Sequence, residues 1–289
     1  MAVISHTIFH KQKQFFSELA VIKAVIVKQW LHMVRYPTWV IQLVLWPLIF
    51  PAAFILTARA FAGPDQMALA VFNQSTGTEN YIGYIVVGTM VWMWQNIVLW
   101  NIGFSLRDEQ LRGTLESNWL SPAWRFSLMI GSVVVQMFTI FLIILVTFLE
   151  YHFLFQVQFQ GNPLLIVLAF LVALPSIYGI GIVFASIVIR VKEANSMVYL
   201  VRGLVMIFCG ITYPISILPE WMKMISQWLP QTYVIRVIRN ITLIGADFNA
   251  VKQDFLILLG FGVFWMVIGF CAFTIMERLS RRSGSIGQY

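Results

Sequence analysis

Long apolar runs separated by short polar segments dominate this sequence. About 20 apolar residues in a helix, each adding roughly 1.5 Å, cross the roughly 30 Å hydrocarbon core of a bilayer. By this measure the pattern predicts six membrane spans, which we place at approximately 38–58, 81–104, 127–149, 163–189, 195–213 and 255–276. The expected fold is therefore an all-α integral membrane protein, with a single transmembrane domain over residues 1–289.

A segment of mixed polarity, 12–35, precedes the first span. Its apolar residues recur at spacings of three and four, so they share one face of a helix. Pro37 separates this helix from the span that follows. We expect an amphipathic helix in the membrane interface, serving either as a simple anchor or as a docking element. Its apolar face consists of Phe15, Leu19, Ile22, Ile26, Trp30 and Met33.

The segment 214–254, before the last span, is long and not simply polar. It contains apolar stretches of about a dozen residues, each too short to cross a bilayer. Prolines at 214, 219 and 230 divide it. We expect two short re-entrant helices here, at roughly 219–228 and 231–243, half-buried at the outer face of the membrane.

Composition supports the membrane assignment. Hydrophobic residues make up 60% of the 289 residues and charged residues only 11%, and the mean hydropathy is +0.82, whereas soluble domains contain about 25% charged residues. The net charge of +7 does not require a nucleic-acid partner, because membrane proteins concentrate Lys and Arg on the cytoplasmic side. With both termini cytoplasmic, 14 of the 19 Lys and Arg residues fall inside, which predicts that orientation.

The polar stretch 107–122, RDEQLRGTLESNWLSP, lies between the second and third spans. Gly113 can adopt the left-handed conformation that ends a helix. Thr114 is a suitable N-cap for a short helix over Leu115–Leu120. Pro122 suits the first position of the helix that leads into the third span. The sequence thus predicts a short, shaped helix on the cytoplasmic side, which is more than a simple connector needs.

This short helix is amphipathic. Leu115, Trp119 and Leu120 are apolar, while Glu116 in the first turn is favoured by the helix dipole. An exposed tryptophan on a cytoplasmic loop requires a protein partner or the lipid surface to cover it. The loop is therefore a candidate docking site.

The sequence GTLE followed by SNWLSP, after the second of six spans, resembles the coupling segment of ABC-transporter permeases of the second exporter type. The run after the fifth span resembles the same family, with Leu218–Trp221 as its Leu-Pro-x-Trp motif and a later Arg239. Leu229-Pro230 stands where Asn-Pro is usual. The resemblance is nearest to the daunorubicin- and nodulation-exporter branch, with polysaccharide exporters as the alternative.

This resemblance implies a homodimer, or a heterodimer, of permeases in the prokaryotic inner (plasma) membrane, each docked on a separate cytosolic ABC ATPase that binds ATP and magnesium. The N-terminal helix and the loop 190–195 would add smaller contacts to that ATPase. The residues that it implies for ATPase coupling are Glu109, Arg112, Gly113, Thr114, Leu115, Glu116, Trp119, Leu120 and Pro122.

The resemblance also implies that spans one, two and five line a substrate pathway at the dimer interface. Arg202 interrupts an apolar span and either faces a vestibule, where it could meet an anionic headgroup, or extends to the cytoplasmic surface by snorkelling. The pathway candidates are Trp46, Trp92, Gln95, Arg202 and Tyr213. The candidates that would cap the pathway on the outside are Pro219, Trp221, Pro230 and Arg239.

Other functional classes fit less well. The sequence contains no G-x-x-x-x-G-K-[ST] phosphate loop, so an ATPase would have to be another chain. No Asp or Glu falls in the middle of a predicted span and all four histidines lie outside the spans or at their ends, which argues against a membrane enzyme, a metal site and an ion-coupled transporter. A passive scaffold would not need the GTLE loop. We expect a non-enzymatic permease subunit that exports an amphiphilic drug or lipid-like substrate, or alternatively a lipid-linked glycan.

Overall fold

The computed structural model describes residues 2–62, 67–111, 113, 125–188 and 194–283, and every regular element among them is helical. The all-α prediction is therefore confirmed for these residues. The elements are α1 Ala2–Arg35, α2 Thr38–Ala62, α3 Met67–Thr76, α4 Tyr81–Leu111, α6 Arg125–Phe155, α7 Pro163–Val188, α8 Ala194–Phe208, the 3-10 turn η1 Ile215–Ile217, α9 Glu220–Gln227, α10 Pro230–Ile244 and α11 Phe248–Ser283.

Five helices in the described residues are long and apolar enough to cross a membrane. They are α2, α4, α6, α7 and α11, which correspond to five of the six predicted spans. The predicted span 195–213 is instead the shorter α8, which ends at Phe208 because Gly210, with φ of +65°, turns the chain. Its 15 residues rise about 22 Å, less than the roughly 30 Å of hydrocarbon. A sixth crossing therefore stays a prediction. The helix α3 was not predicted.

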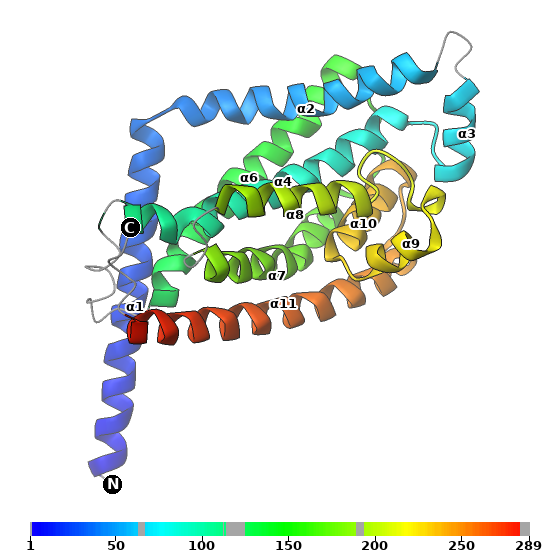
Figure 1. Ribbon diagram of the computed structural model, residues 1–289. Coiled ribbons are helices and arrows are strands. Elements are labelled where there is room, and N and C mark those ends of the chain that lie inside the picture. The colour runs from blue at the N-terminus through cyan, green and yellow to red at the C-terminus, as the bar shows by residue number, and fades with distance from the viewer. Residues whose placement is uncertain (1, 63–66, 112, 114–124, 189–193, 284–289) are drawn as a thin grey trace.

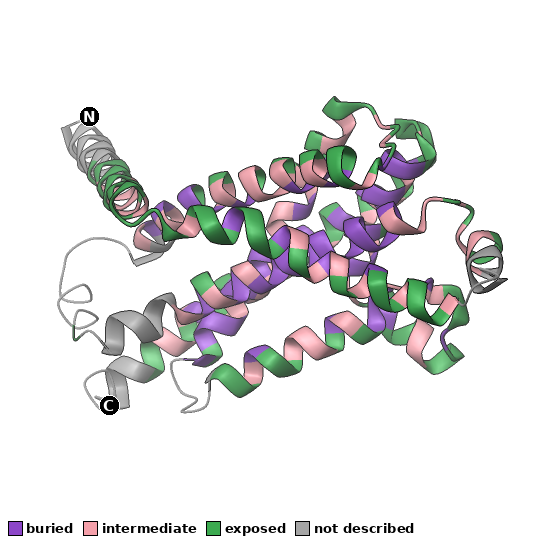
Figure 2. Cartoon of the chain, turned by 90° about the horizontal axis from the view of Figure 1, so that it is seen from above, coloured by how far each residue is buried: buried purple, intermediate pink, exposed green. Residues whose placement is uncertain are grey.

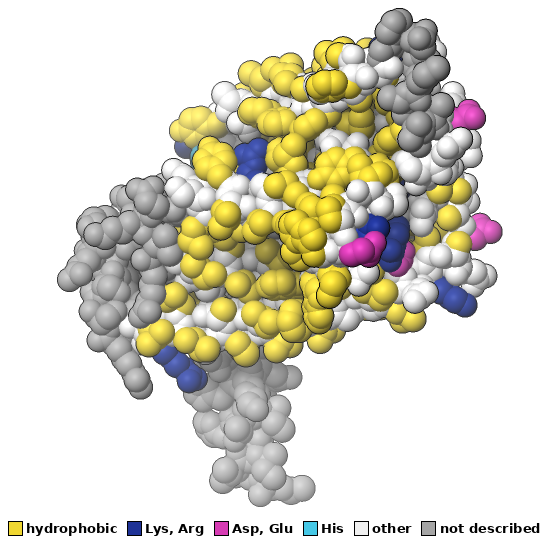
Figure 3. Space-filling view, turned by 45° about the vertical axis from the view of Figure 1, so that its right-hand side comes forward, with side chains coloured by type: hydrophobic (Ala, Val, Ile, Leu, Met, Phe, Trp, Pro, Cys, Tyr) yellow, Lys and Arg dark blue, Asp and Glu magenta, His cyan; other side chains and the backbone are white. Residues whose placement is uncertain are grey.

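The helix α4 forms the centre of the bundle, and 89% of its 18-residue apolar stretch is buried. The outer helices α2, α6 and α11 are only 22% buried over theirs. Buried residues accordingly concentrate along the middle of the bundle (Figure 2). Hydrophobic side chains cover much of the flank in Figure 3, as contact with lipid requires.

The two ends of the bundle carry different elements (Figure 1). At one end, on the left of the figure, lie the end of α4, the start of α6, the end of α7, the start of α8, the end of α11 and the helix α1. At the opposite end lie α3, α9 and α10. The helix ends next to the predicted coupling loop thus lie at one end of the bundle, and the predicted outer region lies at the other.

The helix α1 runs across the direction of the bundle (Figure 1) and packs on α6. It ends at Arg35, just before Pro37, as predicted. Of its predicted apolar face, Ile22, Ile26 and Met33 are partly buried, whereas Leu19 and Trp30 are exposed. A second helix covers only a narrow strip of α1, so the outer members of the apolar stripe remain uncovered. That α1 lies in a membrane interface remains a prediction.

Candidate functional site

The predicted coupling segment begins where α4 ends. The last residue of α4 is Leu111, and Gly113 is exposed with φ of +69°, the left-handed conformation expected of it. Glu109 lies in the last turn of α4. The chain therefore leaves the bundle at the position that the sequence indicated. The remaining coupling candidates, Arg112, Thr114, Leu115, Glu116, Trp119, Leu120 and Pro122, lie outside the described residues, as does most of the loop 190–195.

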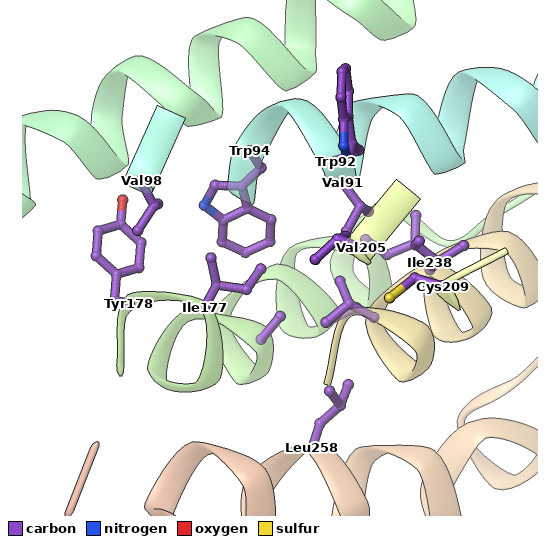
Figure 4. Close-up of a cluster of buried hydrophobic side chains, with 14 of the residues drawn as sticks. Val91, Trp92, Trp94, Val98, Ile177, Tyr178, Val205, Cys209, Ile238 and Leu258 are labelled. Carbon is purple, nitrogen blue, oxygen red and sulfur yellow. The ribbon is translucent and has the colours of Figure 1, made fainter. Parts of the chain in front are cut away.

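The helix α4 connects this point with the opposite end of the molecule. Its 31 residues extend about 45 Å, and it packs against α2, α6, α7, α8 and α10. Trp94 of α4 stacks on Phe170 of α7 at 4.6 Å between ring centroids, and Figure 4 shows its indole near Ile177 of α7. A displacement at the end of α4 would therefore be passed to most of the bundle.

A buried arginine of α10 holds the first turns of α4. Arg239 of α10 is only 7% exposed. Its guanidinium donates hydrogen bonds to the carbonyl oxygens of Tyr84 at 2.9 Å, Gly210 at 2.7 Å and Ile211 at 2.5 Å, and it lies 3.3 Å from the centroid of the Tyr84 ring. We call this set of contacts the Arg239 clamp. It joins α10 both to α4 and to the turn that follows α8.

A second polar contact joins α4 and α10 in the interior. Nε2 of Gln231 donates a hydrogen bond to Oε1 of Gln95 at 2.7 Å, and both residues are 1% exposed. The sequence placed Gln95 among the pathway candidates, but the structure buries it inside a single chain and turns it toward α10. A role for Gln95 in lining a pathway would require α4 and α10 to separate. The sequence offered no sign of its partner, which lies 136 residues away.

Three of the predicted pathway residues, Trp46, Trp92 and Arg202, lie in one row. Trp46 stacks on Phe50 at 5.0 Å, and Phe50 meets the edge of Trp92 at 5.6 Å. The guanidinium of Arg202 lies 4.8 Å from the Trp92 ring centroid and 5.7 Å from that of Tyr199. We call these five residues the aromatic–arginine row. It spans α2, α4 and α8, the elements expected to line the pathway.

Two members of the row were missed in the sequence. Phe50 is four residues after Trp46 and Tyr199 is three before Arg202, so each shares a helix face with a predicted residue. That spacing is the signal that could have identified them. The indole of Trp92 also donates a hydrogen bond to the backbone carbonyl of Arg202 at 3.2 Å, which fixes α8 against α4.

The remaining candidates lie in the turn after α8 and in or next to α9 and α10. The hydroxyl of Tyr213, in the turn after α8, donates to the carbonyl of Ile207 at 2.5 Å, away from the row. Pro219 is the N-cap of α9 and Trp221 is exposed on that helix. Pro230 begins α10 and is buried, as suits the first position of a helix. Two helices are thus present within a residue of the bounds expected for the re-entrant helices, and α9 is largely exposed and α10 largely buried. That they re-enter the membrane at its outer face stays a prediction.

Comparison with known proteins agrees with this architecture. A family model described as ABC-2 family transporter protein matches residues 64–271, which is most of the chain and includes every element from α3 to α10. None of the curated proteins compared with the chain matches it. Since the family match covers well over half of the sequence, this multi-pass membrane chain belongs to the ABC-2 transporter family, the permease subunits of ABC exporters, whose ATPase is a separate protein.

Proposed function

We propose that this chain exports an amphiphilic drug or lipid-like substrate across a prokaryotic plasma membrane, driven by a cytosolic ABC ATPase that docks on residues 113–120. The observation that carries the proposal is the exit of the chain at Gly113. The left-handed glycine follows α4 at the same end of the bundle as the end of α7, the start of α8 and the end of α11, opposite α9 and α10 (Figure 1). An ATPase at that end could contact several connecting segments at once.

The proposed mechanism uses α4 as a lever. ATP binding would close the paired ATPases and displace residues 113–120, and therefore the end of α4. Because α4 is a continuous buried helix, the displacement would reach α10 through the Gln95–Gln231 hydrogen bond and the Arg239 clamp. Movement of α10 and of the adjoining α9 would then open or close the outer end.

We also propose that a second copy of the chain covers the face formed by α2 and α8. In a bilayer, exposed apolar residues alone do not indicate a partner, because lipid covers them equally well. This face, however, also carries the positive charge of Arg202, which lipid hydrocarbon accommodates poorly. A dimer along α2 and α8 would enclose the aromatic–arginine row in a pathway between the two copies.

Co-purification tests the proposed function. The permease would be expressed with each ABC ATPase encoded next to its gene and purified through a tag on the permease alone. We expect one ATPase to co-purify in a 1:1 ratio of chains and to hydrolyse ATP faster in the complex than alone. If none of these ATPases binds a correctly folded permease, the proposal fails.

A charge reversal in the coupling segment gives a sharper test. Glu116→Lys is expected to reduce ATP-dependent transport at least tenfold, because the new lysine would face the ATPase surface that now accepts a carboxylate. Thermal unfolding of the permease should not change. The matched control is Glu79→Lys, an exposed glutamate before α4 at the opposite end, which should transport normally. Equal transport by the two variants would contradict a coupling role for Glu116.

A further inference from the structure

Arg202 carries its charge at the middle of the bundle. It is the ninth of the 15 residues of α8, and its guanidinium lies 4.8 Å from the ring of Trp92. Trp92 stands at the midpoint of the apolar stretch Tyr81–Phe104 of α4. The guanidinium is therefore held at mid-depth over an aromatic ring, and is not extended toward either end of α8 as snorkelling would require.

The charge has no anionic partner in the part of the chain that the structure describes. The acidic residues Glu220 and Asp254 pair with Lys223 and Arg236 instead. The rings of Trp92 and Tyr199 stabilise the cation through their negative faces, but they do not accept its strong N–H donors as a carboxylate or phosphate would. A charge in this position costs at least about 2.5 kcal/mol on insertion scales, so it is expected to serve binding or transport.

A second copy of the chain cannot neutralise this arginine. A two-fold interface brings the same surface of both copies together. Neither α2 nor α8 contains an Asp or Glu, so a dimer along these helices would add a second Arg202 and no carboxylate. The acidic residues of α4 lie in its last turn, far from Trp92. In such a dimer, a counter-charge at this depth would come from a molecule that enters between the copies.

The surroundings of Arg202 suit a ligand with an apolar part. A side chain at Gly203, the next residue, would meet no atom within 4 Å, so no other part of the chain covers α8 at that position. Tyr199 is 59% exposed and Trp46 is 49% exposed, so both rings are available for contact. A single cation with aromatic walls matches an amphiphile that has one anionic group and a hydrocarbon portion.

We propose that Arg202 binds the anionic group of the transported molecule, a phosphate or carboxylate on an amphiphile, while the exposed rings of Trp46 and Tyr199 contact its apolar portion. This inference rests on the proposed export function and specifies the class of substrate. A phospholipid, an acidic drug and a glycan linked to lipid phosphate share this chemistry.

Binding to the purified full-length permease tests the inference. In neutral detergent, binding of dodecyl phosphate and of laurate would be followed by tryptophan fluorescence, with the uncharged dodecyl maltoside and inorganic phosphate alone as comparisons. We expect both anionic amphiphiles to bind, each at least tenfold more tightly than inorganic phosphate. Arg202→Gln should weaken both by about tenfold or more, since a charge-assisted hydrogen bond is lost, and Arg202→Lys should weaken them less. The matched control, Lys252→Gln at an exposed site on α11, should bind as the unaltered protein does.

Each result of this experiment either supports or contradicts the proposed role of Arg202. Equal affinity of the Arg202→Gln variant and the unaltered protein for dodecyl phosphate would overturn the inference. It would also be overturned if the unaltered protein bound inorganic phosphate as tightly as dodecyl phosphate. Equal affinity for laurate and dodecyl phosphate would support a general anionic amphiphile, and preference for either would narrow the class. Because co-purification with an ATPase is measured separately, a failure here would leave the proposed function standing.

Discussion

Arg239→Leu is expected to destabilise the protein by about 3 kcal/mol or more. The substitution removes the donors for the backbone carbonyls of Gly210 and Ile211, which lie outside a helix and would be left buried without partners, and it also removes the side-chain donor to the Tyr84 carbonyl, which keeps its bond within α4. Each unsatisfied buried polar group costs roughly 1–3 kcal/mol. Thermal unfolding of the purified permease in detergent would measure the loss. Arg239→Lys should recover only part of the stability, because an ammonium cannot reproduce the planar fork of a guanidinium.

The same helix supplies the control. Arg236 is exposed and pairs with Asp254 of α11, with 2.8 Å between Nε and Oδ2. Exposed ion pairs typically contribute about 0–1 kcal/mol, so Arg236→Leu should unfold near the temperature of the unaltered protein. Similar losses in the two variants would show that the clamp does not hold the outer end together.

Gly88→Ala is expected to cost about 2–3 kcal/mol. A Cβ atom at this position of α4 would overlap the carbonyl oxygen of Ile211 and Nη2 of Arg239, and would lie 2.8 Å from the carbonyl carbon of Ile211. Since two of these atoms belong to the backbone, the contact cannot be relieved by rotating a side chain, and overpacking of this kind typically costs about 1–3 kcal/mol. Thermal unfolding would again report the change.

Gly260→Ala in α11 provides the matched comparison for Gly88. A Cβ at Gly260 meets nothing within 4 Å, and alanine in a helix interior is favoured over glycine by roughly 0.5–1 kcal/mol. This variant should therefore be as stable as the unaltered protein or slightly more so. If Gly88→Ala were also as stable as the unaltered protein, α4 would not approach the turn after α8 as closely as the structure shows.

The pattern of apolar runs predicted most of the helices, because a helix that faces lipid must be apolar over its whole length. Five predicted spans correspond to helices that are long and apolar enough to cross a membrane. The helix in the fifth predicted span, 195–213, ends earlier than expected for a local reason. Residues 209–213 are apolar enough to continue a span, but Gly210 turns the chain in a left-handed conformation. The ten-residue α3 was missed because it is too short and too mixed to stand out.

Contacts between distant segments could not be predicted from one sequence. The position of Arg239 followed from family resemblance, but its carbonyl partners lie 28–155 residues away and depend on how α4, α8 and α10 meet. Gln95 was predicted to line the pathway, yet it pairs with Gln231 in the interior. In contrast, the grouping of Trp46, Trp92 and Arg202 agrees with the expectation that spans one, two and five lie together.

Side-specific cross-linking at position 116 tests the central claim most directly. Glu116→Cys would be introduced together with Cys271→Ser, since Cys271 is exposed while Cys209 is buried. The variant would be co-expressed with the neighbouring ABC ATPase. We predict that the new thiol cross-links to that ATPase and that an impermeant maleimide labels it in inside-out vesicles lacking the ATPase but not in intact cells. Labelling from outside intact cells, with no cross-link, would contradict the account.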